Sequence, residues 1–580
     1  MTSIHNGPDD FVDDALDGLT RAHPRQVRRV DGGVVRATPV PPGQVAVVLG
    51  GGSGHYPAFA GLVGPGLATG AVCGQVFTSP SAAQAYHVAH ACDRGAGVLF
   101  LYGNYAGDVL HFGLAQERLR GEGHDVRTLL VTDDIASAPT GQEHQRRGVA
   151  GDFVVVKLAG AAAEGGAGLD EVERVARCAN ERTRTLGIAL SGCTLPGADA
   201  PLFTVPTATM SVGLGIHGEP GVSDEPLPAA RTLAERLITD LVAESRPEWG
   251  SRAVVLVNGL GTVSHEELFI LFAGVARALS DRGVEVVDAE VGELVTSLDM
   301  GGLSVTVCWV DDELERLWRA PANSAAYTRV PGPEPVDTEV PDVGTYDRGI
   351  PAVADDRSAA ARAAGPRAVA ALDTAVQALA REERRLGDLD AVAGDGDHGT
   401  GMLRGARGAL AAAQGAVDSG AGLSGALIAA GRAWADVGGG TSGALWGAGL
   451  ERAARHLHDA DDLDTAAIAG AARSALDAIT GLGGANPGDK TIVDAFEPLV
   501  RALEAAATAG TGLGAAWHLA ASAALAGAKG TAALVPVRGR ARPLAERSRG
   551  HADPGATSFA LLAGALAEQS PTAEPSGAQP

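Results

Sequence analysis

The stretch QVAVVLGGGSGH, residues 44–55, decides the fold of the first half of the chain. Its apolar run passes directly into glycines and ends at His55, as a buried strand does when it turns at the edge of a sheet. Amphipathic helical patterns separate it from later runs of the same kind. Those Val- and Leu-rich runs lie at residues 97–104, 126–134, 152–160, 252–261 and 303–312. The alternation predicts an α/β fold with helices layered on strands.

The second half of the chain has a different pattern. Residues 371–386, 403–417 and 523–534 are rich in Ala and Leu with helical periodicity. Between the halves, residues 330–357 are rich in proline and acidic residues, which is typical of a linker. We therefore expect an α/β domain at 1–329, a linker at 330–357, an all-helical domain at 358–568 and a disordered tail at 569–580.

The composition argues against several classes of function. A net charge of −24 lacks the positive surface that nucleic-acid binding requires, so we expect no nucleic-acid partner. The five cysteines form no C-x-x-C pair, which argues against structural zinc and a disulfide framework. No apolar run approaches the roughly 18 residues of a membrane helix, and the acidic start does not resemble a signal peptide. We therefore expect no membrane partner and a cytoplasmic location.

Three carboxylates lie close together in the second half, within LDAVAGDGDHGTGM at 389–402. Asp390, Asp395 and Asp397 would repel one another on this glycine-rich backbone unless a cation neutralised them. Their oxygens suit Mg²⁺ or Ca²⁺, although no glutamate closes an EF-hand pattern. The alternative is an acidic surface turn in which Asp397 or His398 caps the next helix. The spacing alone leaves both interpretations open.

Further glycine-bearing turns with hydroxyl or charged residues follow at 439–443, 486–491 and 539–558. Such turns present backbone N–H groups of the kind that bind phosphate. The turn at 486–491 is not a Walker A loop, because an aspartate separates its glycine from its lysine. Each turn alone is typical of an ordinary connection between helices. Together with the carboxylates they favour a magnesium–nucleotide site.

The stretch SVGLGIHGEPG, residues 211–221, matches the G-x-G-x-x-G spacing of dinucleotide-binding turns. Pro220 follows the third glycine where a helix should begin, and residues 207–212 make a poor buried strand, so we reject that interpretation. The glycines around His217 would instead leave room for a small substrate at its imidazole. A histidine nucleophile there would select carbonyl compounds, and a structural histidine is the alternative.

Two further candidates lie at predicted strand ends. His55 either belongs to a tight backbone approach to a small polar ligand or caps a structural turn. Asp108, within YGNYAGDVLHF at 102–112, follows a strand end, which is where site residues lie in open α/β sheets. The alternative for Asp108 is a helix cap.

These motifs together resemble those of the ATP-dependent, single-chain dihydroxyacetone kinase family along nearly the whole chain. The matching segments, in chain order, are NGPDDFVDDALDGL, GGGSGH, VFTSPS, GNYAGD, RRGVAG, GIALSGCTLP, GLGIHGEPG, TSLDMGGLS, GDGDHG, GGTSGAL, PGDKT and GHADPGATS. Ordered matches in both halves make the resemblance specific. It implies a ketone-binding domain of two α/β subdomains, followed by an all-α helical barrel that binds the nucleotide.

The resemblance also implies roles for individual residues near the ketone. His217 matches the histidine that forms a hemiaminal with the substrate carbonyl. His55 matches the histidine that assists proton transfer at the reacting hydroxyl, and Asp108 matches the aspartate beside it. The residues that fall in the substrate-binding loop are Gly52, Ser53 and Gly54.

In the second half, the resemblance implies a site for ATP and Mg²⁺. Asp390, Asp395 and Asp397 match the carboxylates that hold two Mg²⁺ ions on the phosphates of ATP. The positions that match nucleotide contacts are His398, Gly399, Thr400, Gly401, Thr441, Ser442, Gly483, Arg540, Asp553, Pro554 and Gly555. The implied reaction is in-line transfer of a phosphoryl group to the primary hydroxyl of a short-chain ketose.

Three positions depart from the family pattern. Tyr56 stands where a glutamate is usual, Gly103 where many members have a lysine, and Pro543 where a tyrosine is frequent. Loss of the lysine would open space in the pocket, and Tyr56 would change the surroundings of His55. We therefore expect erythrulose rather than dihydroxyacetone as the ketose. Pro543 bears on the shape of the nucleotide lid.

The alternatives are a strict dihydroxyacetone (glycerone) kinase, an FAD-AMP lyase that forms cyclic FMN, and a ketose sensor without catalysis. A subunit of a phosphotransferase system is disfavoured because such systems split the two domains between chains. The resemblance also implies a homodimer formed through the ketone-binding domain.

Overall fold

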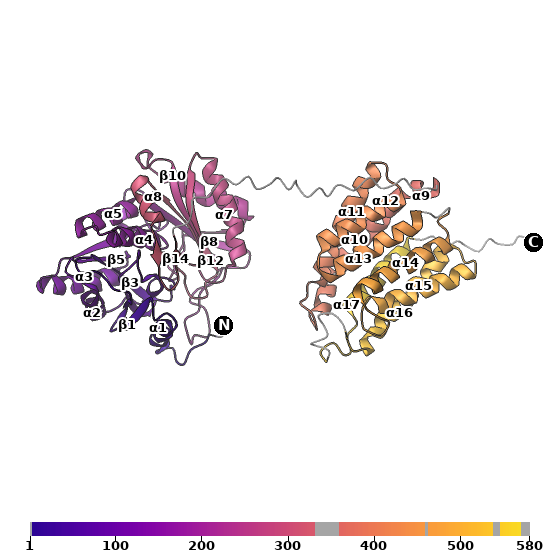
Figure 1. Cartoon of the computed structure of the whole chain (residues 1–580), viewed down its shortest axis with the longest axis horizontal. Helices are drawn as coiled ribbons and strands as arrows, with labels where there is room; N and C mark the ends of the chain where they lie inside the picture. The colour runs from indigo at the N-terminus through magenta and orange to yellow at the C-terminus, as the bar shows by residue number, and fades with distance from the viewer. Residues whose placement is uncertain (1–2, 331–358, 459–461, 538–545, 570–580) are drawn as a thin grey trace, which may run out of the picture. The chain divides into compact units, whose positions relative to one another are not determined.

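The computed structural model describes residues 3–330, 359–458, 462–537 and 546–569. The chain forms two compact units, Met1–Thr338 and Glu339–Pro580 (Figure 1). The first unit combines strands and helices, and the described part of the second contains helices without strands. The predicted order of an α/β half followed by an all-helical half is therefore confirmed.

The first sheet of the α/β unit has the strand order β1-β2-β4-β3-β5-β6. Strands β3 to β6 are parallel, and β1 and β2 extend the sheet in antiparallel fashion. All of β5 is buried, as a parallel sheet covered on both faces requires. The strands are β1 (Val27–Val30), β2 (Gly33–Arg36), β3 (Ala46–Ser53), β4 (Gly70–Val76), β5 (Val98–Gly103) and β6 (Val126–Val131).

The strand order reverses between β3 and β5. From β3 the chain passes to β4 on one side, whereas β5 pairs with β3 on the other side. The connections at the carboxyl ends of such a strand pair diverge and leave a crevice. His55 follows β3, and Asp108 lies in the first turn of α3 (Ala106–Gly121), which follows β5. The fold thus directs both predicted site residues to one crevice.

The second sheet has the order β11-β10-β12-β7-β8-β9, in which β10 and β11 alone run parallel. The connection between β8 and β9 carries His217. The strands are β7 (Thr183–Ala189), β8 (Thr209–Val212), β9 (Ser223–Pro226), β10 (Arg252–Gly259), β11 (Glu285–Gly292) and β12 (Gly302–Trp309). A small separate hairpin joins β13 (Ala322–Asn323) to β14 (Thr328–Arg329).

Helices fill the space on and between the two sheets. Helices α2 (Ala82–Cys92) and α3 pack on one face of the first sheet, while α6 (Ala230–Ala243) and α7 (His265–Ser280) pack on one face of the second. Helix α4 (Gly151–Glu164) shares a core with the remaining faces of both sheets. The other helices of this unit are α1 (Phe11–Ala22), α5 (Leu169–Glu181) and α8 (Asp312–Arg319).

Two of the strand predictions in this unit were wrong. Residues 152–160 belong to α4, in which every residue from Gly151 to Ala163 is buried. A helix enclosed on all sides is apolar all round, so its sequence cannot be told from a buried strand by periodicity. Residues 209–212, judged a poor strand, form β8, which pairs with β7 and β9.

The second unit is a set of neighbouring helices, drawn orange to yellow in Figure 1. Alanine and glycine let these helices approach closely, and a Cβ on Gly447 of α13 would lie 2.7 Å from the carbonyl oxygen of Gly431 in α12. The helices are α9 (Ala359–Ala363), α10 (Gly365–Asp390), α11 (His398–Asp418), α12 (Leu423–Gly438), α13 (Gly440–His458), α14 (Thr465–Gly483), α15 (Val493–Thr508), α16 (Leu513–Gly530) and α17 (Pro554–Glu568).

Apart from their first residues, the predicted linker at 330–357 and the predicted tail at 569–580 lie outside the described residues. The predicted domain boundaries therefore stay predictions. Within the described ranges, no helix is both long enough and apolar enough to cross a bilayer.

Asn258, at the end of β10, connects the second sheet to the segment that begins at Leu294. Its buried amide donates to the Val295 carbonyl (2.8 Å) and the Ser304 hydroxyl (3.2 Å), and its oxygen accepts from the backbone N–H groups of Leu294 and Val295. We expect Asn258→Ala to lower the free energy of unfolding of the first unit by about 3 kcal/mol, because several buried polar groups lose their partners. Hydrogen exchange of the full-length chain, read on peptides from β10 and β12, measures this loss.

Asn323→Ala is the matched control, because Asn323 is exposed in the small hairpin. We expect it to change the free energy of unfolding by no more than about 0.5 kcal/mol. Unchanged protection of β10 and β12 in Asn258→Ala would contradict the role of Asn258.

Candidate functional site

The crevice of the first unit brings two histidines from different sheets into direct contact. His55 Nε2 lies 2.9 Å from His217 Nε2. His55 Nδ1 lies 2.8 Å from the Thr296 carbonyl, which only accepts, so Nδ1 of His55 carries a proton. Burial and the neighbouring His217 lower the pKa of His55 to about 3, so its imidazole is neutral at neutral pH. The side chain of His217 is 23% exposed.

Backbone contacts from the second sheet hold this arrangement. The Thr296 N–H donates to the His55 carbonyl (3.2 Å), and the Leu298 N–H donates to the Gly54 carbonyl (2.9 Å). The buried Ser297 hydroxyl donates to the carbonyl of Ile216, the residue before His217. One short segment thus fixes both histidine loops.

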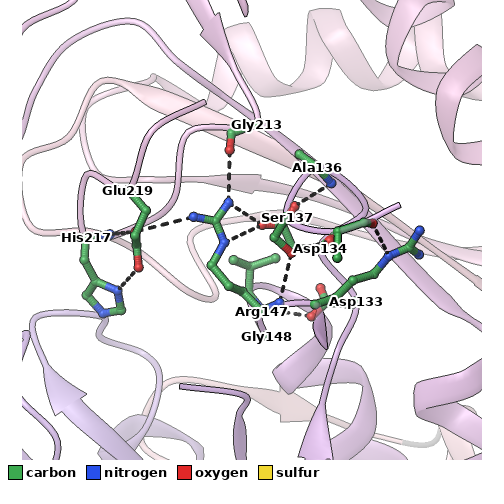
Figure 2. Close-up of polar contacts among 12 residues, drawn as sticks. Asp133, Asp134, Ala136, Ser137, Arg147, Gly148, Gly213, His217 and Glu219 are labelled. Carbon is green, nitrogen blue, oxygen red and sulfur yellow. Dashed lines mark hydrogen bonds and ion pairs between the residues drawn. The ribbon is translucent and has the colours of Figure 1, made fainter. Parts of the chain in front are cut away.

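The loop that carries His217 also contains a carboxylate on the far side of the imidazole ring (Figure 2). Glu219 Oε1 lies 3.0 Å from His217 Nδ1, and Glu219 Oε2 accepts the His217 backbone N–H at 3.0 Å. Although burial opposes it, hydrogen bonding and charge interaction with His217 lower the pKa of Glu219 to about 2. The ring therefore lies between a carboxylate on one nitrogen and His55 on the other.

Arg147 lies behind Glu219 and links it to the body of the unit. Its guanidinium approaches Glu219 Oε2 at 3.9 Å, bonds Asp134 Oδ2 at 2.8 Å and donates to the Gly213 carbonyl at 3.1 Å (Figure 2). Asp134 also accepts the Ala136 backbone N–H at 3.0 Å. Arg147 is thereby held on three sides.

The glycines of this loop have a physical reason that differs from the predicted one. Gly213 and Gly218 adopt φ of +72° and +86°, and a Cβ there would strike Ala136 or Phe203 rather than enter free space. A Cβ on Gly215 would collide with Glu219 Oε2 and lie 2.6 Å from Arg147 Nη1. The glycines therefore serve the turn and the Glu219–Arg147 pair instead of clearing room at the imidazole.

Aromatic rings enclose the two histidines. Phe77 stacks on His55 with centroids 5.1 Å apart and meets His217 edge-on at 5.2 Å. Tyr105 meets His217 edge-on at 5.0 Å, and Phe59 meets His55 at 6.3 Å. Such walls limit water around the imidazoles.

The predicted substrate loop curves around the Phe77 segment. A Cβ on Gly52 would lie 2.6 Å from the Thr78 nitrogen, and one on Gly54, whose φ is +103°, would lie 2.8 Å from the Phe77 ring. Ser53 Oγ donates to the Gly74 carbonyl at 2.7 Å. Glycines are therefore required at both positions.

Asp108 is buried in the same crevice and interacts electrostatically with His217. Burial raises the pKa of Asp108 to about 6, although a hydrogen bond from Ser79 and the charge of His217 oppose the rise. Its Oδ1 has no hydrogen-bond partner among the described residues. An unsatisfied buried acceptor fits the hydroxyl of a bound substrate.

The two departures from the family pattern on this side do not widen the crevice at the histidines. A Cβ on Gly103 would lie 2.9 Å from the Tyr105 ring, whose hydroxyl donates to the Gly148 carbonyl at 3.0 Å, so that space is filled. Tyr56 is 47% exposed, and its ring lies beside Gly61. The expectation that Gly103 opens space is therefore not supported by the structure.

The second unit contains a cavity of about 720 Å³. The predicted nucleotide contacts that line it are His398, Thr400, Gly401, Thr441, Ser442, Gly483, Asp553, Pro554 and Gly555. Gly399 is buried instead, and a Cβ there would collide with the backbone of Glu383 in α10. Arg540 and Pro543 lie outside the described residues.

The three predicted metal ligands meet at this cavity. Asp390, Asp395 and Asp397 each offer an oxygen within 4.8 Å of the others, and all three line the cavity. Asp390 ends α10, Asp397 precedes α11, and the Gly396 N–H donates to Asp390 Oδ2 at 2.9 Å. Hard oxygen donors at this spacing fit Mg²⁺.

The start of α17 and its neighbours form another part of the cavity wall. Asp553 caps α17 by accepting the Ala556 N–H at 2.7 Å, and burial raises the pKa of Asp553 to about 7. His398 Nε2 lies 2.9 Å from Ser558 Oγ, which ties α11 to α17. A helix N-terminus that opens into a cavity favours anionic ligands such as phosphates.

Several lining residues were not singled out from the sequence. Lys490 is buried, and its ammonium donates to the carbonyls of Ser548 (2.7 Å) and Leu534 (3.2 Å). Trp434 and Trp446 stack with centroids 4.8 Å apart and line an apolar part of the cavity. In the first unit, Glu219, Phe77, Tyr105 and Thr296 were likewise missed. Glu219 could have been found from the sequence, because its carboxylate stands two residues after His217. Thr296 could not, because it acts through its main-chain carbonyl, which every residue has.

Comparison with known proteins agrees with the two-unit arrangement. Residues 17–326 match the Dak1 domain, and residues 392–568 match the DAK2 domain. The chain is 52% identical to the L-erythrulose 1-kinase of Mycolicibacterium smegmatis, over 98% of this chain and 99% of the relative. It is 51% identical to the D-erythrulose kinase of the same organism, over 98% of each.

A solved structure covers both units. The dihydroxyacetone kinase from C. freundii, in complex with AMP-PNP and Mg²⁺, is 30% identical with a TM-score of 0.59, over 98% of this chain and 99% of that one. The Dak1 match alone spans more than half of the chain. The chain therefore belongs to the dihydroxyacetone kinase family, as a member that carries the Dak1 and DAK2 domains in one polypeptide.

Proposed function

We propose that this chain is an ATP-dependent erythrulose kinase that binds its ketose covalently at His217 and phosphorylates a primary hydroxyl. The observation that carries this proposal is the contact between His217 and His55 at 2.9 Å, beside the rings of Phe77 and Tyr105 and together with the buried, unsatisfied oxygen of Asp108. The two erythrulose kinases that are about half identical to this chain over nearly its full length support a four-carbon ketose.

The crevice offers each group that the reaction needs. His217 Nε2 attacks the ketone carbon and holds the substrate, while the loop at 52–54 lies beside it. Asp108 accepts the proton of the primary hydroxyl as the phosphoryl group is transferred, and His55 assists this proton movement. Covalent attachment fixes the reacting hydroxyl and so reduces the entropy lost in the transfer step.

In the second unit, Asp390, Asp395 and Asp397 would hold Mg²⁺, which neutralises phosphate charge when bound. The hydroxyls of Thr441 and Ser442 and the N-terminus of α17 line the same cavity and would orient the phosphates. The stacked tryptophans offer an apolar surface for the base.

A strict dihydroxyacetone kinase is the second candidate, since the solved relative at 30% identity is a dihydroxyacetone kinase. A cyclising FAD-AMP lyase would use the helical unit without His217, and a ketose sensor would need no transfer. The homodimer, the cytoplasmic location and the lack of a nucleic-acid partner stay predictions from the sequence.

Purified full-length protein with Mg-ATP is expected to release ADP with a higher kcat/KM for D- or L-erythrulose than for dihydroxyacetone, and with little turnover of glycerol. His217→Ala is expected to lose ketose turnover because the covalent anchor is gone, while its affinity for ATP is unchanged. A coupled assay of ADP release measures both.

A preference for dihydroxyacetone would replace the proposed substrate with that of the second candidate. ATP binding without turnover of any ketose would overturn the kinase, and full activity in His217→Ala would overturn the covalent anchor.

Because Asp108 must be ionised to accept a proton and its pKa is raised to about 6, we expect kcat/KM for the ketose to fall as the pH drops below about 6. Asp108→Asn is expected to remove this acid limb and to lower kcat by about 10²- to 10⁴-fold. Glu117→Gln, an exposed change on the same helix, should leave the profile unchanged. An acid limb that persists in Asp108→Asn would show that another group sets it.

Asp395→Asn is expected to raise the Mg²⁺ concentration needed for half-maximal activity by about tenfold or more, because one hard oxygen ligand is lost. Its KM for the ketose should not change, since that site lies in the other unit. Asp436→Asn is the control, because Asp436 is exposed and does not line the cavity. An unchanged Mg²⁺ dependence would remove Asp395 from the metal site.

A further inference from the structure

We propose that Glu219, held by Arg147, is the positioning residue that keeps His217 as a doubly protonated ring ready to deliver its Nε2 proton to the incoming ketone. The inference rests on the proposed function, because it assigns a device to the same covalent anchor. It concerns Glu219 and Arg147, to which the sequence motifs assign no role, and Gly215, which leaves space for this pair.

The proton between the two histidines can be located from hydrogen-bond chemistry. His55 donates through Nδ1 to the Thr296 carbonyl, so its Nε2 in the neutral ring has a lone pair and accepts. The contact at 2.9 Å then requires His217 Nε2 to donate. In the resting site, the atom that must attack the ketone therefore carries a proton.

The other nitrogen of His217 faces a carboxylate. Glu219 Oε1, 3.0 Å from His217 Nδ1, only accepts when ionised, so Nδ1 carries a proton as well. With protons on both nitrogens, the ring is a cation paired with Glu219 (Figure 2). Both donors of His217 are thus satisfied by two different acceptors.

The carboxylate is itself fixed in place. Its second oxygen accepts the His217 backbone N–H at 3.0 Å and faces Arg147, whose guanidinium is anchored on Asp134 and the Gly213 carbonyl. Gly215 supplies the space, because a Cβ at that position would collide with Glu219 Oε2. A loop that only carried a histidine would need neither the Glu219–Arg147 pair nor a glycine at position 215.

Atoms and electrons balance in the proposed addition of His217 to the ketone. As the ketone enters, the proton on His217 Nε2 passes through His55 Nε2 to the carbonyl oxygen. Nε2 then uses the freed electron pair to form a bond to the carbonyl carbon, and the C=O π bond breaks. The product is a hemiaminal with a hydroxyl group, and the ring keeps its Nδ1 proton and its positive charge. Glu219 faces one positive ring before and after the step.

Several titratable or charged groups face His217, and the pH behaviour depends on all of them. The groups from other elements are His55, Tyr105, Asp108 and, behind Glu219, Arg147 with Asp134. Asp108 sets the acid limb discussed above. The proton shared by the histidines must be present for addition, so its loss sets an alkaline limb.

The test is the pH profile of kcat/KM for the ketose in full-length wild type and Glu219→Gln. Because a carboxylate favours the protonated ring beside it, we expect the alkaline limb of Glu219→Gln to move toward lower pH by about one unit. Near neutral pH we expect kcat/KM for the ketose to fall about tenfold, with KM for ATP unchanged. A merely structural role would not move the limb.

Gly215→Ala provides an independent variant that keeps every charge. The Cβ of the alanine displaces the Glu219–Arg147 pair. We therefore expect kcat/KM for the ketose to fall near neutral pH, and its alkaline limb to move toward lower pH as in Glu219→Gln. Glu225→Gln is the matched control, because Glu225 lies six positions further along the chain and bonds Ser223 and Arg236 instead of a histidine. We expect it to leave the profile unchanged.

The outcomes separate this inference from the proposed function. If wild type turns over a ketose and His217→Ala does not, the anchor stands. An unmoved alkaline limb in both Glu219→Gln and Gly215→Ala would then overturn the positioning role alone. If wild type turns over no ketose, or His217→Ala is fully active, the proposed function itself fails. Circular dichroism of the variants identifies a loss caused by misfolding, in which case Glu219→Asp, which keeps the charge, must restore the limb.

Discussion

The hydrogen bond between His55 and His217 is the contact on which the candidate substrate site depends, because its two partners come from different sheets. His55 follows a strand of the first sheet, and His217 lies in a connection of the second. Their distance is therefore set by how the sheets are held together. Helix α4, buried between them, fixes the sheets, and the segment at 296–298 bonds both histidine loops. The geometry of the imidazoles is a consequence of the packed core.

Two chemically identical rings acquire different tasks from their surroundings. His55 is buried without a carboxylate partner, so its ring stays neutral and its Nε2 accepts a hydrogen bond from His217. His217 is partly exposed, and its Nδ1 lies 3.0 Å from the Glu219 carboxylate. Environments that push two titratable groups apart are the usual way in which an enzyme separates acid and base roles. Here the separation is achieved with one carboxylate and one main-chain carbonyl.

The sequence predicted the α/β and all-helical halves and the candidate residues, but it predicted poorly which groups contact those residues. Strand runs that end in glycine indicated the sheet edges that carry His55 and Asp108, whereas α4 was missed because a fully enclosed helix has no polar face to show its period. Thr296 acts through its carbonyl, which any residue would offer. Gly103 suggested open space, but the Tyr105 ring that fills it approaches from a turn whose path the sequence does not reveal. Contacts made by the backbone or across turns require coordinates.

The two units differ in the charge of the ligand that each has to bind. The first binds a neutral ketose, so its charges are paired internally and its walls are aromatic. The second must accept a highly charged nucleotide, yet three carboxylates line its cavity. Without a cation these carboxylates would repel the phosphates. Mg²⁺ is therefore needed for the nucleotide to enter the cavity as well as for transfer, whereas the covalent attachment that we propose for the ketose at His217 requires no ion.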